Sequence, residues 1–196
     1  MTGRVGGAIE GLSCAWTPSH WGDLGIVWRG SGKDVRVQRI LLPTENDYDW
    51  ARDLVQTFPT NLDLPAPIAE ISHRMGRFLH GKALTFEQRH LDLLALADCS
   101  PFQRRVLPAE FGIPRGSVST YGRIAAHLGV PGGARAVGNA LARNPFPIVI
   151  PCHRAVRADG SLGGFRGGVS MKRALLEMEG IPISPSGRVR VDRLYY

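Results

Sequence analysis

The segment FPIVIPCHRAV, at residues 146–156, constrains the fold more than any other part of the sequence. The apolar run IVI predicts a strand, and Pro151 ends it, because proline cannot donate a hydrogen bond to a sheet. The chain must then bend at Cys152. Only a bend lets Cys152 and His153 act on the same side, since neighbouring strand residues point to opposite faces. An imidazole next to a thiol, directly or through one water, is the usual means of forming a nucleophilic thiolate.

Two other interpretations of this pair are open. Free cysteines are mostly buried packing residues, so Cys152 could lie in the core beside a histidine that caps backbone groups. A metal site agrees less well with the spacing, because Cys152 and His153 are adjacent and no second pair follows at ligand spacing. We therefore predict that no metal ion binds here.

A histidine that accepts a proton needs an orienting partner, usually a carboxylate. The predicted helix SMKRALLEMEG runs from a Ser170 cap to Gly180 just past its end, and it places Glu179 at the negative end of the helix dipole. A carboxylate is electrostatically misplaced there, so a functional partner such as His153 would explain it. An exposed glutamate on a surface helix is the alternative.

The distribution of charge predicts a polyanionic partner. Residues 1–98 carry 10 Lys and Arg against 12 Asp and Glu, whereas residues 99–196 carry 14 against 5. Nearly all cations of the second half are arginines, which suit bidentate phosphate contacts and stacking on bases. Nucleic-acid binding is one interpretation, and a merely solubilising basic face is the other.

The three cysteines and the hydropathy pattern indicate that the protein is located in the cytoplasm. Cys14, Cys99 and Cys152 cannot all pair within the chain and lack CxxC spacing, which favours a reducing environment. The N-terminus has no apolar core of signal-peptide length, and no stretch approaches the ~18 apolar residues of a membrane span. We expect a cytoplasmic protein without membrane contact.

Residues 1–98 combine strands and helices. The segments GLSCAW, LGIVWRG and VRVQRILLP are short, β-rich and separated by Gly, Pro and Ser, which predicts a small antiparallel sheet. Helices are predicted over residues 47–58 and 65–81, the second with Gly81 past its end. Residues 91–97, LDLLALA, form a further strand or a short buried segment, and we place a domain boundary near residue 98. The apolar stripe of the second helix consists of Ile68, Ile71, Met75 and Phe78.

The second half opens with a predicted helix over SPFQRRVLPAEF, with a Ser100 cap and Pro101 at the first position. Pro108 should kink or end it. Two short helices follow around a turn at Gly129 and Pro131, which suggests a helix-turn-helix whose second helix normally meets DNA. The first of these helices turns Ile124, Ala125 and Leu128 inward, and the second runs to about Arg143.

Small residues leave one surface of the second helix almost without side chains, so it can approach a groove closely. Tight packing against another helix is the alternative. Arg135 favours DNA, because a cation in the first turn is disfavoured by the helix dipole by ~0.3–1 kcal/mol. The small residues are Ala134, Ala136, Gly138, Ala140 and Ala142.

The glycine-rich segment RADGSLGGFRGG, residues 157–168, predicts a ligand wall. Asp159 and Gly160 form a hairpin-turn signal, and further glycines bracket Phe165 and Arg166. Glycine permits close approach to a flat ligand, and Phe165 offers a stacking face, which suits a nucleobase. An ordinary flexible loop is the alternative.

Together these residues resemble the O6-alkylguanine-DNA alkyltransferase family. The resemblance covers about residues 100–180 and includes, in order, SPFQRRV, TYGRIA, ARAVGNALARNP, PIVIPCHR and GGFRGGVSMKRALLEMEG. The PCHR core with RAVG upstream is highly specific. Residues 1–98 resemble the variable N-terminal domain of the family only in size and in their order of strands before helices.

The resemblance implies an α+β fold with two domains and an extension. Residues 1–98 would form a supporting domain of a small β-sheet plus helices, ribonuclease H-like. Residues 99–182 would form the alkyltransferase domain, mainly helical and winged-helix-like with a helix-turn-helix. Residues 183–196 extend beyond the resemblance.

The resemblance also implies roles for individual residues. Cys152 would accept the alkyl group, His153 would act as its base through a bound water, and Glu179 would orient His153. Asn144 would tie the active-site turn to the recognition helix. Tyr121 would help to flip the damaged nucleotide and assist protonation of the guanine.

The implied DNA contacts lie in the minor groove. Base extrusion costs a few kcal/mol, which Arg135 would partly offset by filling the vacated place in the stack. The other residues implied to contact the base or the DNA are Pro147 and Phe165 in the pocket, the backbone of Cys152, Ala155 and Arg166, and the small residues Ala136 and Gly138.

The implied activity is a single, irreversible transfer from O6-alkylguanine in double-stranded DNA, without a cofactor. A monomer is expected, and cooperative binding along DNA is left open. A lesion sensor that lacks transfer is the competing hypothesis, but such relatives lack the acceptor cysteine. A metal- or redox-sensing regulator would need more thiols.

Three departures from the family pattern affect these roles. Ala155 replaces the more frequent valine, and Phe165 replaces tyrosine, which removes a hydroxyl. Arg166 is bulkier than many residues at its place, so it would narrow the pocket or contact a phosphate. Cys14 and the scattered histidines of the first half form no convincing zinc set.

Overall fold

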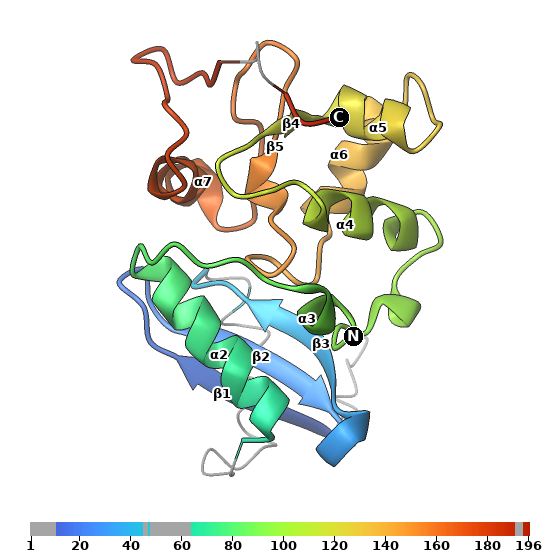
Figure 1. The fold of residues 1–196 in the computed structure, drawn as a ribbon, viewed down its shortest axis with the longest axis vertical. Coiled ribbons are helices and arrows are strands. Elements are labelled where there is room, and N and C mark those ends of the chain that lie inside the picture. Colours follow the sequence, from blue (N-terminus) through green and yellow to red (C-terminus); the bar gives the residue numbers. More distant parts are fainter. Residues whose placement is uncertain (1–10, 45–46, 48–63, 191–193) are drawn as a thin grey trace, which may run out of the picture.

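The computed structural model describes residues 11–44, 47, 64–190 and 194–196, and its architecture is mixed α+β. A three-stranded antiparallel sheet in the order β1-β2-β3 lies in one half of the molecule, and helices α4 to α7 lie in the other (Figure 1). The predicted antiparallel sheet is therefore confirmed. Its strands are β1 (Leu12–Thr17), β2 (Leu24–Arg29) and β3 (Arg36–Leu41).

Helix α2 (Ala66–Leu79) covers one face of this sheet (Figure 1). It buries the predicted apolar stripe of Ile68, Ile71, Met75 and Phe78 in a core shared with the strands. Gly81 follows its end with a φ of +79°, as glycine often does after a helix. The helix predicted over residues 47–58 lies outside the described residues, apart from Asp47.

Residues 91–97 form a short, partly buried segment rather than a regular strand, with Leu91, Leu94 and Ala95 buried. They connect α3 (Gln88–Leu91) to the 3-10 helix η2 (Leu96–Asp98). Val37 of β3 donates its N–H to Leu93 O at 2.8 Å and accepts a hydrogen bond from Ala95 N at 2.9 Å. The segment therefore pairs with part of the outer edge of β3, which would otherwise be open.

Helices α5 and α6 are two short helices around a turn, as predicted. Thr120 caps α5 by accepting a hydrogen bond from Arg123 N at 3.2 Å, and Gly129 ends the following turn with a φ of +69°. Within the described parts of the chain, no helix has the length and apolar character needed to cross a membrane. The elements of this half are α4 (Gln103–Phe111), α5 (Tyr121–His127), α6 (Ala134–Ala142) and α7 (Gly168–Met178), with β4 (Ser119–Thr120) parallel to β5 (Ala155–Val156).

Two predicted helix starts are wrong. Helix α4 begins at Gln103 rather than Pro101, although Ser100 Oγ still accepts a hydrogen bond from Gln103 N at 3.3 Å. Helix α7 begins at Gly168, so Ser170 lies inside the helix and not at its cap. Gly168 has a φ of +85°, which glycine adopts without strain, so it makes the turn that leads into the helix.

Pro108 does not end α4, which continues through it to Phe111. Proline removes the hydrogen bond to the carbonyl four residues earlier, which belongs to Arg104. Because Arg104 is exposed, solvent can satisfy that carbonyl. The helix therefore tolerates the proline.

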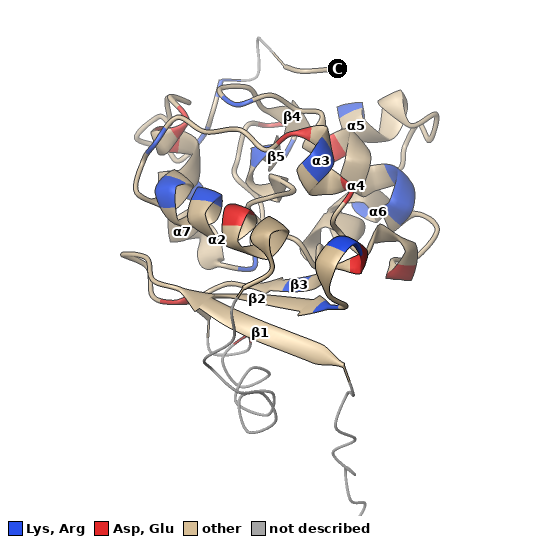
Figure 2. Cartoon of the chain, turned by 60° about the horizontal axis from the view of Figure 1, so that its bottom comes forward, with Lys and Arg blue, Asp and Glu red and all other residues tan. Residues whose placement is uncertain are grey.

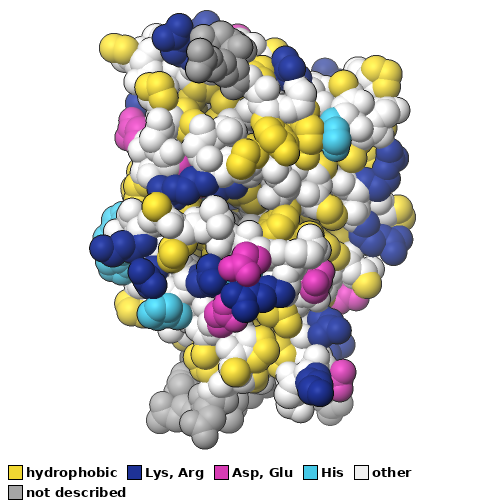
Figure 3. Space-filling view, viewed as in Figure 1, with side chains coloured by type: hydrophobic (Ala, Val, Ile, Leu, Met, Phe, Trp, Pro, Cys, Tyr) yellow, Lys and Arg dark blue, Asp and Glu magenta, His cyan; other side chains and the backbone are white. Residues whose placement is uncertain are grey.

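Charged side chains are arranged differently on the two halves. Acidic and basic side chains are interleaved on the face that carries α2 (Figure 3), where Glu70, Arg74, Glu87 and Arg89 form ion pairs of 3.0–3.2 Å. Exposed pairs of this kind contribute only ~0–1 kcal/mol each. Helices α4, α5 and α6 carry a series of exposed arginines (Figure 2), namely Arg104, Arg105, Arg123 and Arg135.

Glu110 of α4 is a fully buried acid. Among the described residues, neither of its carboxylate oxygens has a hydrogen-bond partner. Burial raises the pKa of Glu110 to about 8, although the charges of Lys172 and Arg154 oppose this shift. Its contribution to stability is therefore fully present below its ordinary pKa of 4.5 and is lost as the pH rises through about 8.

Replacing Glu110 with glutamine should stabilise the protein selectively at high pH. Relative to the wild type, we expect the free energy of unfolding of Glu110→Gln to rise by ~1–3 kcal/mol between pH 5 and pH 9, because only the carboxyl must ionise in a buried place. Urea unfolding at both pH values measures this difference. The same substitution at the exposed Glu177 is the control, and a pH-independent difference at Glu110 would contradict the assignment.

Candidate functional site

A cavity of about 700 Å³ lies between α5, α6 and the glycine-rich loop of residues 157–168. It brings together most of the predicted site residues from separate parts of the chain. His153, Ala155 and Glu179 are buried and lie behind its lining. The predicted residues that line it are Tyr121, Asn144, Pro147, Cys152, Phe165 and Arg166, with Arg135 and Gly138 from α6.

The predicted strand IVI is a tight turn instead. Ile150 N donates to Phe146 O at 2.8 Å, and Ile148 has a φ of +72°, which β-branched residues rarely adopt. Asn144 closes this turn from both ends, because its Nδ2 donates to Ile150 O at 3.1 Å and its Oδ1 accepts from Phe146 N at 2.9 Å. These hydrogen bonds and the burial of Ile148 offset a backbone strain of ~1–2 kcal/mol.

The chain bends at Cys152, as predicted, in a single turn of 3-10 helix, η3 (Cys152–Arg154). Burial raises the pKa of the Cys152 thiol to about 11. A hydrogen bond from Asn144 and the positive charge of Lys172 act in the opposite direction but do not overcome the burial. The thiol is therefore protonated at rest, and a reaction through the thiolate needs a base close by.

His153, which follows Cys152 in the chain, is a fully buried base. Its Nε2 donates to Glu179 Oε1 at 3.0 Å, which assigns the proton to Nε2 and leaves Nδ1 as the acceptor. Among the described residues, Nδ1 has no hydrogen-bond partner. Burial lowers the pKa of His153, although Glu179 opposes the shift, so the ring is neutral and can accept a proton.

Glu179 lies at the C-terminal cap of α7, and its carboxylate is buried between the His153 ring and the cationic Arg154. Besides His153, Arg154 donates to both oxygens, from Nε at 2.8 Å and from Nη2 at 2.7 Å. Burial by itself raises the pKa of Glu179, but the hydrogen bonds from His153 and Arg154, together with the positive charge of Arg154, lower it to about 2. The alternative of an exposed surface glutamate is wrong.

Arg154 is a residue that sequence reasoning missed. In addition to Glu179, it binds Ile113 O through Nη1 at 2.6 Å. It therefore connects η3 to the segment after α4 and to α7. Its position next to His153 in the PCHR motif is the signal that could have identified it.

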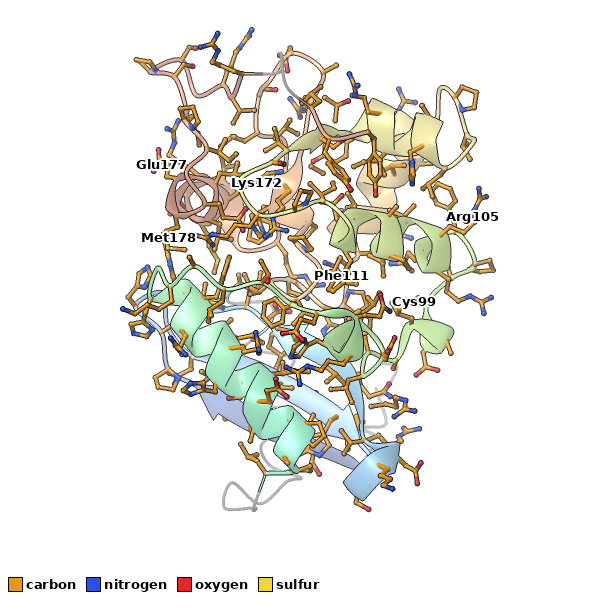
Figure 4. The ribbon with its side chains drawn as sticks, in the orientation of Figure 1. Cys99, Arg105, Phe111, Lys172, Glu177 and Met178 are labelled. Carbon is orange, nitrogen blue, oxygen red and sulfur yellow. The ribbon has the colours of Figure 1, made fainter. Side chains whose placement is uncertain are left out.

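Lys172 was also missed. It extends from α7 into the interior (Figure 4), where its Nζ donates to Ala155 O at 2.6 Å and to Gly164 O at 3.4 Å. It lies 5.9 Å from the centre of the Tyr121 ring, and burial lowers its pKa to about 8. The sequence did contain a signal, because Lys172 falls on the apolar stripe of α7, three residues before the buried Leu175.

Tyr121 and Phe165 supply the aromatic part of the lining. A Cβ atom at Gly163 would lie 2.9 Å from Tyr121 Oη, and the φ of Gly163 is +70°, so a side chain there would displace the tyrosine. Burial raises the pKa of Tyr121 to about 12, so its hydroxyl keeps its proton. Phe165 meets the His153 ring edge-on, with centroids 6.4 Å apart.

Of the five small residues predicted to leave one surface of α6 bare, Ala134, Gly138 and Ala142 line the cavity together, but Ala136 and Ala140 do not. Residues two apart in a helix lie on different faces. Ala140 instead packs into the core, and Ala136 is exposed outside the cavity lining. Arg135 is exposed and belongs to the lining.

The three cysteines are free thiols, and only Cys152 is in the cavity lining; Cys14 and Cys99 are half-buried elsewhere. Burial raises the pKa of both Cys14 and Cys99. Within the described residues, no group of His, Cys, Asp and Glu side chains is arranged to hold a metal ion.

The chain is similar to known proteins over the whole of this cavity. A sequence model of the 6-O-methylguanine DNA methyltransferase DNA-binding domain matches residues 101–181, which include all residues of the cavity lining. A methylated-DNA–protein-cysteine methyltransferase of Methanothermobacter thermautotrophicus is 40% identical over 161 residues, covering 82% of this chain and 81% of that protein. The protein of the same name from Mycobacterium tuberculosis is 53% identical over 78 residues, covering 40% of this chain and 47% of that protein.

Solved structures give the same result. The crystal structure of Mycobacterium tuberculosis O6-methylguanine methyltransferase has a TM-score of 0.67 at 30% identity, and the match covers 92% of this chain and 96% of that one. The structure of M. tuberculosis OGT in complex with DNA has a TM-score of 0.66 at 29% identity, covering 85% and 92%. The mixed α+β architecture is thus that of these proteins.

The buried carboxylate of Glu179 should make a large contribution to stability that depends on pH. We expect Glu179→Gln to lower the free energy of unfolding at neutral pH by ~2–4 kcal/mol, because Arg154 loses its counter-charge. The folded pKa of about 2 lies below the ordinary 4.5, so this contribution is present above pH 4.5 and is lost as the pH falls towards 2. Urea unfolding across this range measures it.

The control for this prediction is Glu177→Gln on the same helix. Glu177 pairs with Arg173 at 3.3 Å in an exposed position, so its loss should change stability by less than ~0.5 kcal/mol. Equal effects of the two substitutions would show that the buried carboxylate has no special role.

Proposed function

The chain belongs to the methylated-DNA–protein-cysteine methyltransferase family, and we propose which of its residues carry out the reaction of that family. The protein repairs DNA by transferring an alkyl group from a DNA base to a cysteine of its own chain, so DNA is its partner. We propose that the acceptor is Cys152 and that the substrate is an O6-alkylguanine base flipped into the 700 Å³ cavity.

The observation that carries this proposal is the buried series Cys152, His153 and Glu179 beside the cavity. Nδ1 of His153 accepts the thiol proton through one water, while Nε2 stays bonded to Glu179. Glu179, with a pKa of about 2, remains ionised and stabilises the imidazolium that forms. The positive charge of Lys172 favours the thiolate as it develops.

The transfer is an in-line displacement at the alkyl carbon. A bond forms between Cys152 Sγ and this carbon, while the bond from the carbon to guanine O6 breaks and its electrons remain on the base. The base takes up a proton as it leaves, and we assign Tyr121 as the donor, because it lines the cavity and its pKa of about 12 keeps its hydroxyl protonated before the reaction. Because the thioether does not reverse, each molecule reacts once.

The base is held by the cavity lining and by the backbone. Pro147 and Phe165 pack against it, and the backbone groups of Cys152, Ala155 and Arg166 bind its polar edge. The Ala155 carbonyl already accepts a hydrogen bond from Lys172, but a carbonyl has two lone pairs and can accept a second.

The helix-turn-helix α5–α6 meets the minor groove. Gly138 and Ala136 present little side-chain bulk there, which permits close approach to the DNA. Arg135, exposed beside the cavity, fills the place that the flipped nucleotide leaves in the stack. This contact offsets part of the few kcal/mol that extrusion costs.

We also infer finer features of the molecule. Residues 1–98 form a ribonuclease H-like supporting domain, residues 99–182 a winged-helix-like alkyltransferase domain, and residues 183–196 an extension. The protein acts on DNA as a monomer in the cytoplasm, and its three free thiols are consistent with a reducing compartment.

Incubation with a duplex oligonucleotide that contains O6-methylguanine should add one methyl group to each protein molecule. Peptide mass analysis should place it on the peptide that bears Cys152, and Cys152→Ala should gain none. Methylation of Cys14 or Cys99, or repeated turnover by one molecule, would contradict the proposal. Tight lesion binding without a mass change would instead support a sensor.

Arg135→Ala should separate DNA handling from chemistry. We expect the rate of transfer from duplex DNA to fall by roughly tenfold or more, because extrusion loses its compensating contact, while transfer from free O6-benzylguanine changes by less than about twofold. Single-turnover kinetics on both substrates measure the split. Arg77→Ala, at an exposed arginine of α2, is the control, and equal losses on both substrates would contradict the role of Arg135.

A further inference from the structure

The outer edge of β3 supports the turn that precedes the reactive cysteine. β3 is the strand of the sheet that lies nearest to the half containing α4 to α7 (Figure 1). Ile40 donates its backbone N–H to Pro145 O at 2.8 Å. Pro145 directly follows Asn144, which closes the turn before Cys152. The sheet is therefore bonded to one wall of the cavity.

The residues after β3 reach the opposite wall. Leu42 is fully buried, and its Cδ1 would lie 3.3 Å from a Cβ atom at Gly167, so the two residues pack closely. Asp47 is also buried, and its Oδ2 accepts a hydrogen bond from Leu42 N at 2.9 Å. This bond fixes the carboxylate of Asp47 beside the glycine-rich loop.

Asp47 faces two arginines. Its Oδ1 lies 3.5 Å from Arg166 Nη1 and 3.6 Å from Arg39 Nη2. The Arg166 guanidinium also donates through Nη2 to the backbone carbonyl of Asn144. The side chain of Arg166 is 20% exposed, so this charge is largely removed from water and depends on its partners.

The sequence suggested that Arg166 narrows the pocket or contacts a phosphate, but its contacts favour a different role. Its guanidinium is held between Asn144 O and Asp47 rather than extended to a phosphate. Without Asp47, the positive charges of Arg39 and Arg166 would face each other. Repulsion would then move Arg166 from its place in the cavity wall, together with the neighbouring Phe165.

We propose that Asp47 is a positioning residue for alkyl transfer, because it holds Arg166 against the Asn144 carbonyl. The contact joins the two walls of the cavity between which the base must lie. One wall is the turn closed by Asn144, and the other is the loop that carries Phe165. A residue of the N-terminal sheet region thus sets the geometry of a site it does not touch. The inference rests on the proposed function of Cys152.

The test uses the full chain carrying Asp47→Asn, Arg166→Gln or both. Single-turnover transfer is measured from free O6-benzylguanine and from a duplex with one O6-methylguanine. Each single variant should lower the second-order rate constant by roughly 5- to 20-fold on both substrates, and the double variant should be no slower than the slower single one, because both side chains act through one contact.

Matched controls separate this role from loss of the fold or of DNA contacts. Asp34→Asn, at an exposed acid in the 3-10 helix η1 (Gly32–Asp34), should react at the wild-type rate. Affinity of Asp47→Asn for undamaged duplex should change by less than about twofold, because no phosphate contact is lost. Asp47→Glu, which keeps the charge, should recover most of the rate. If Asp47→Asn does not fold, Arg166→Gln tests the same contact from the other side.

Wild-type rates in Asp47→Asn or in Arg166→Gln would overturn the inference. It would also be overturned if the losses in the two single variants multiply in the double variant. A wild-type protein that gains no alkyl group on Cys152 would instead contradict the proposed function. The two failures are therefore distinguishable.

Discussion

The site depends on one buried anion, the carboxylate of Glu179. The C-terminal end of a helix disfavours negative charge. Glu179 is nevertheless ionised, because His153 and Arg154 donate three hydrogen bonds of 2.7–3.0 Å to it. Arg154 also binds Ile113 O, so this single ion connects α7, the turn η3 and the segment after α4. The placement of the Cys152 sulfur follows from that connection, since Cys152 begins the turn that the anion holds.

Around this anion, the two reacting groups of the protein, Cys152 and His153, are uncharged at rest. Burial keeps Cys152 as a thiol and His153 as a neutral ring. It also raises the pKa of Glu110 to about 8, so that this acid is neutral too, whereas Lys172, whose pKa falls to about 8, keeps its positive charge at neutral pH. A thiolate can form in such surroundings only as its proton passes to a neighbour whose new charge is stabilised. A permanently ionised thiol would also be open to oxidation and to other electrophiles. Keeping the thiol uncharged until the substrate is bound therefore suits a protein whose cysteine can react only once.

The sequence predicted those parts of the site that follow from local chemistry. Because Glu179 lies at the unfavourable end of a helix dipole, the sequence predicted that it pairs with His153. The structure places His153 Nε2 3.0 Å from Glu179 Oε1. The strand IVI was wrong because the left-handed Ile148 is held by Asn144, a tertiary contact that no propensity scale contains. Lys172 was overlooked because a helical lysine is usually solvated, and only its place on the apolar stripe set it apart.

The N-terminal sheet illustrates what sequence patterns do not reveal. Among the described residues, all those of the cavity lining come from residues 121–166, so the sheet contributes no side chain to the lining. Yet the sheet and the residues after it contact the chain at two places next to lining residues. Ile40 meets Pro145, which directly follows Asn144, while Leu42 meets Gly167 and Asp47 meets Arg166 at the end of the glycine-rich loop. Because a close-packed interior transmits small displacements, holding the Asn144 turn and the glycine-rich loop holds the two walls that these segments form. The sheet is therefore part of the geometry of the reaction, although the chemistry is confined to the other half.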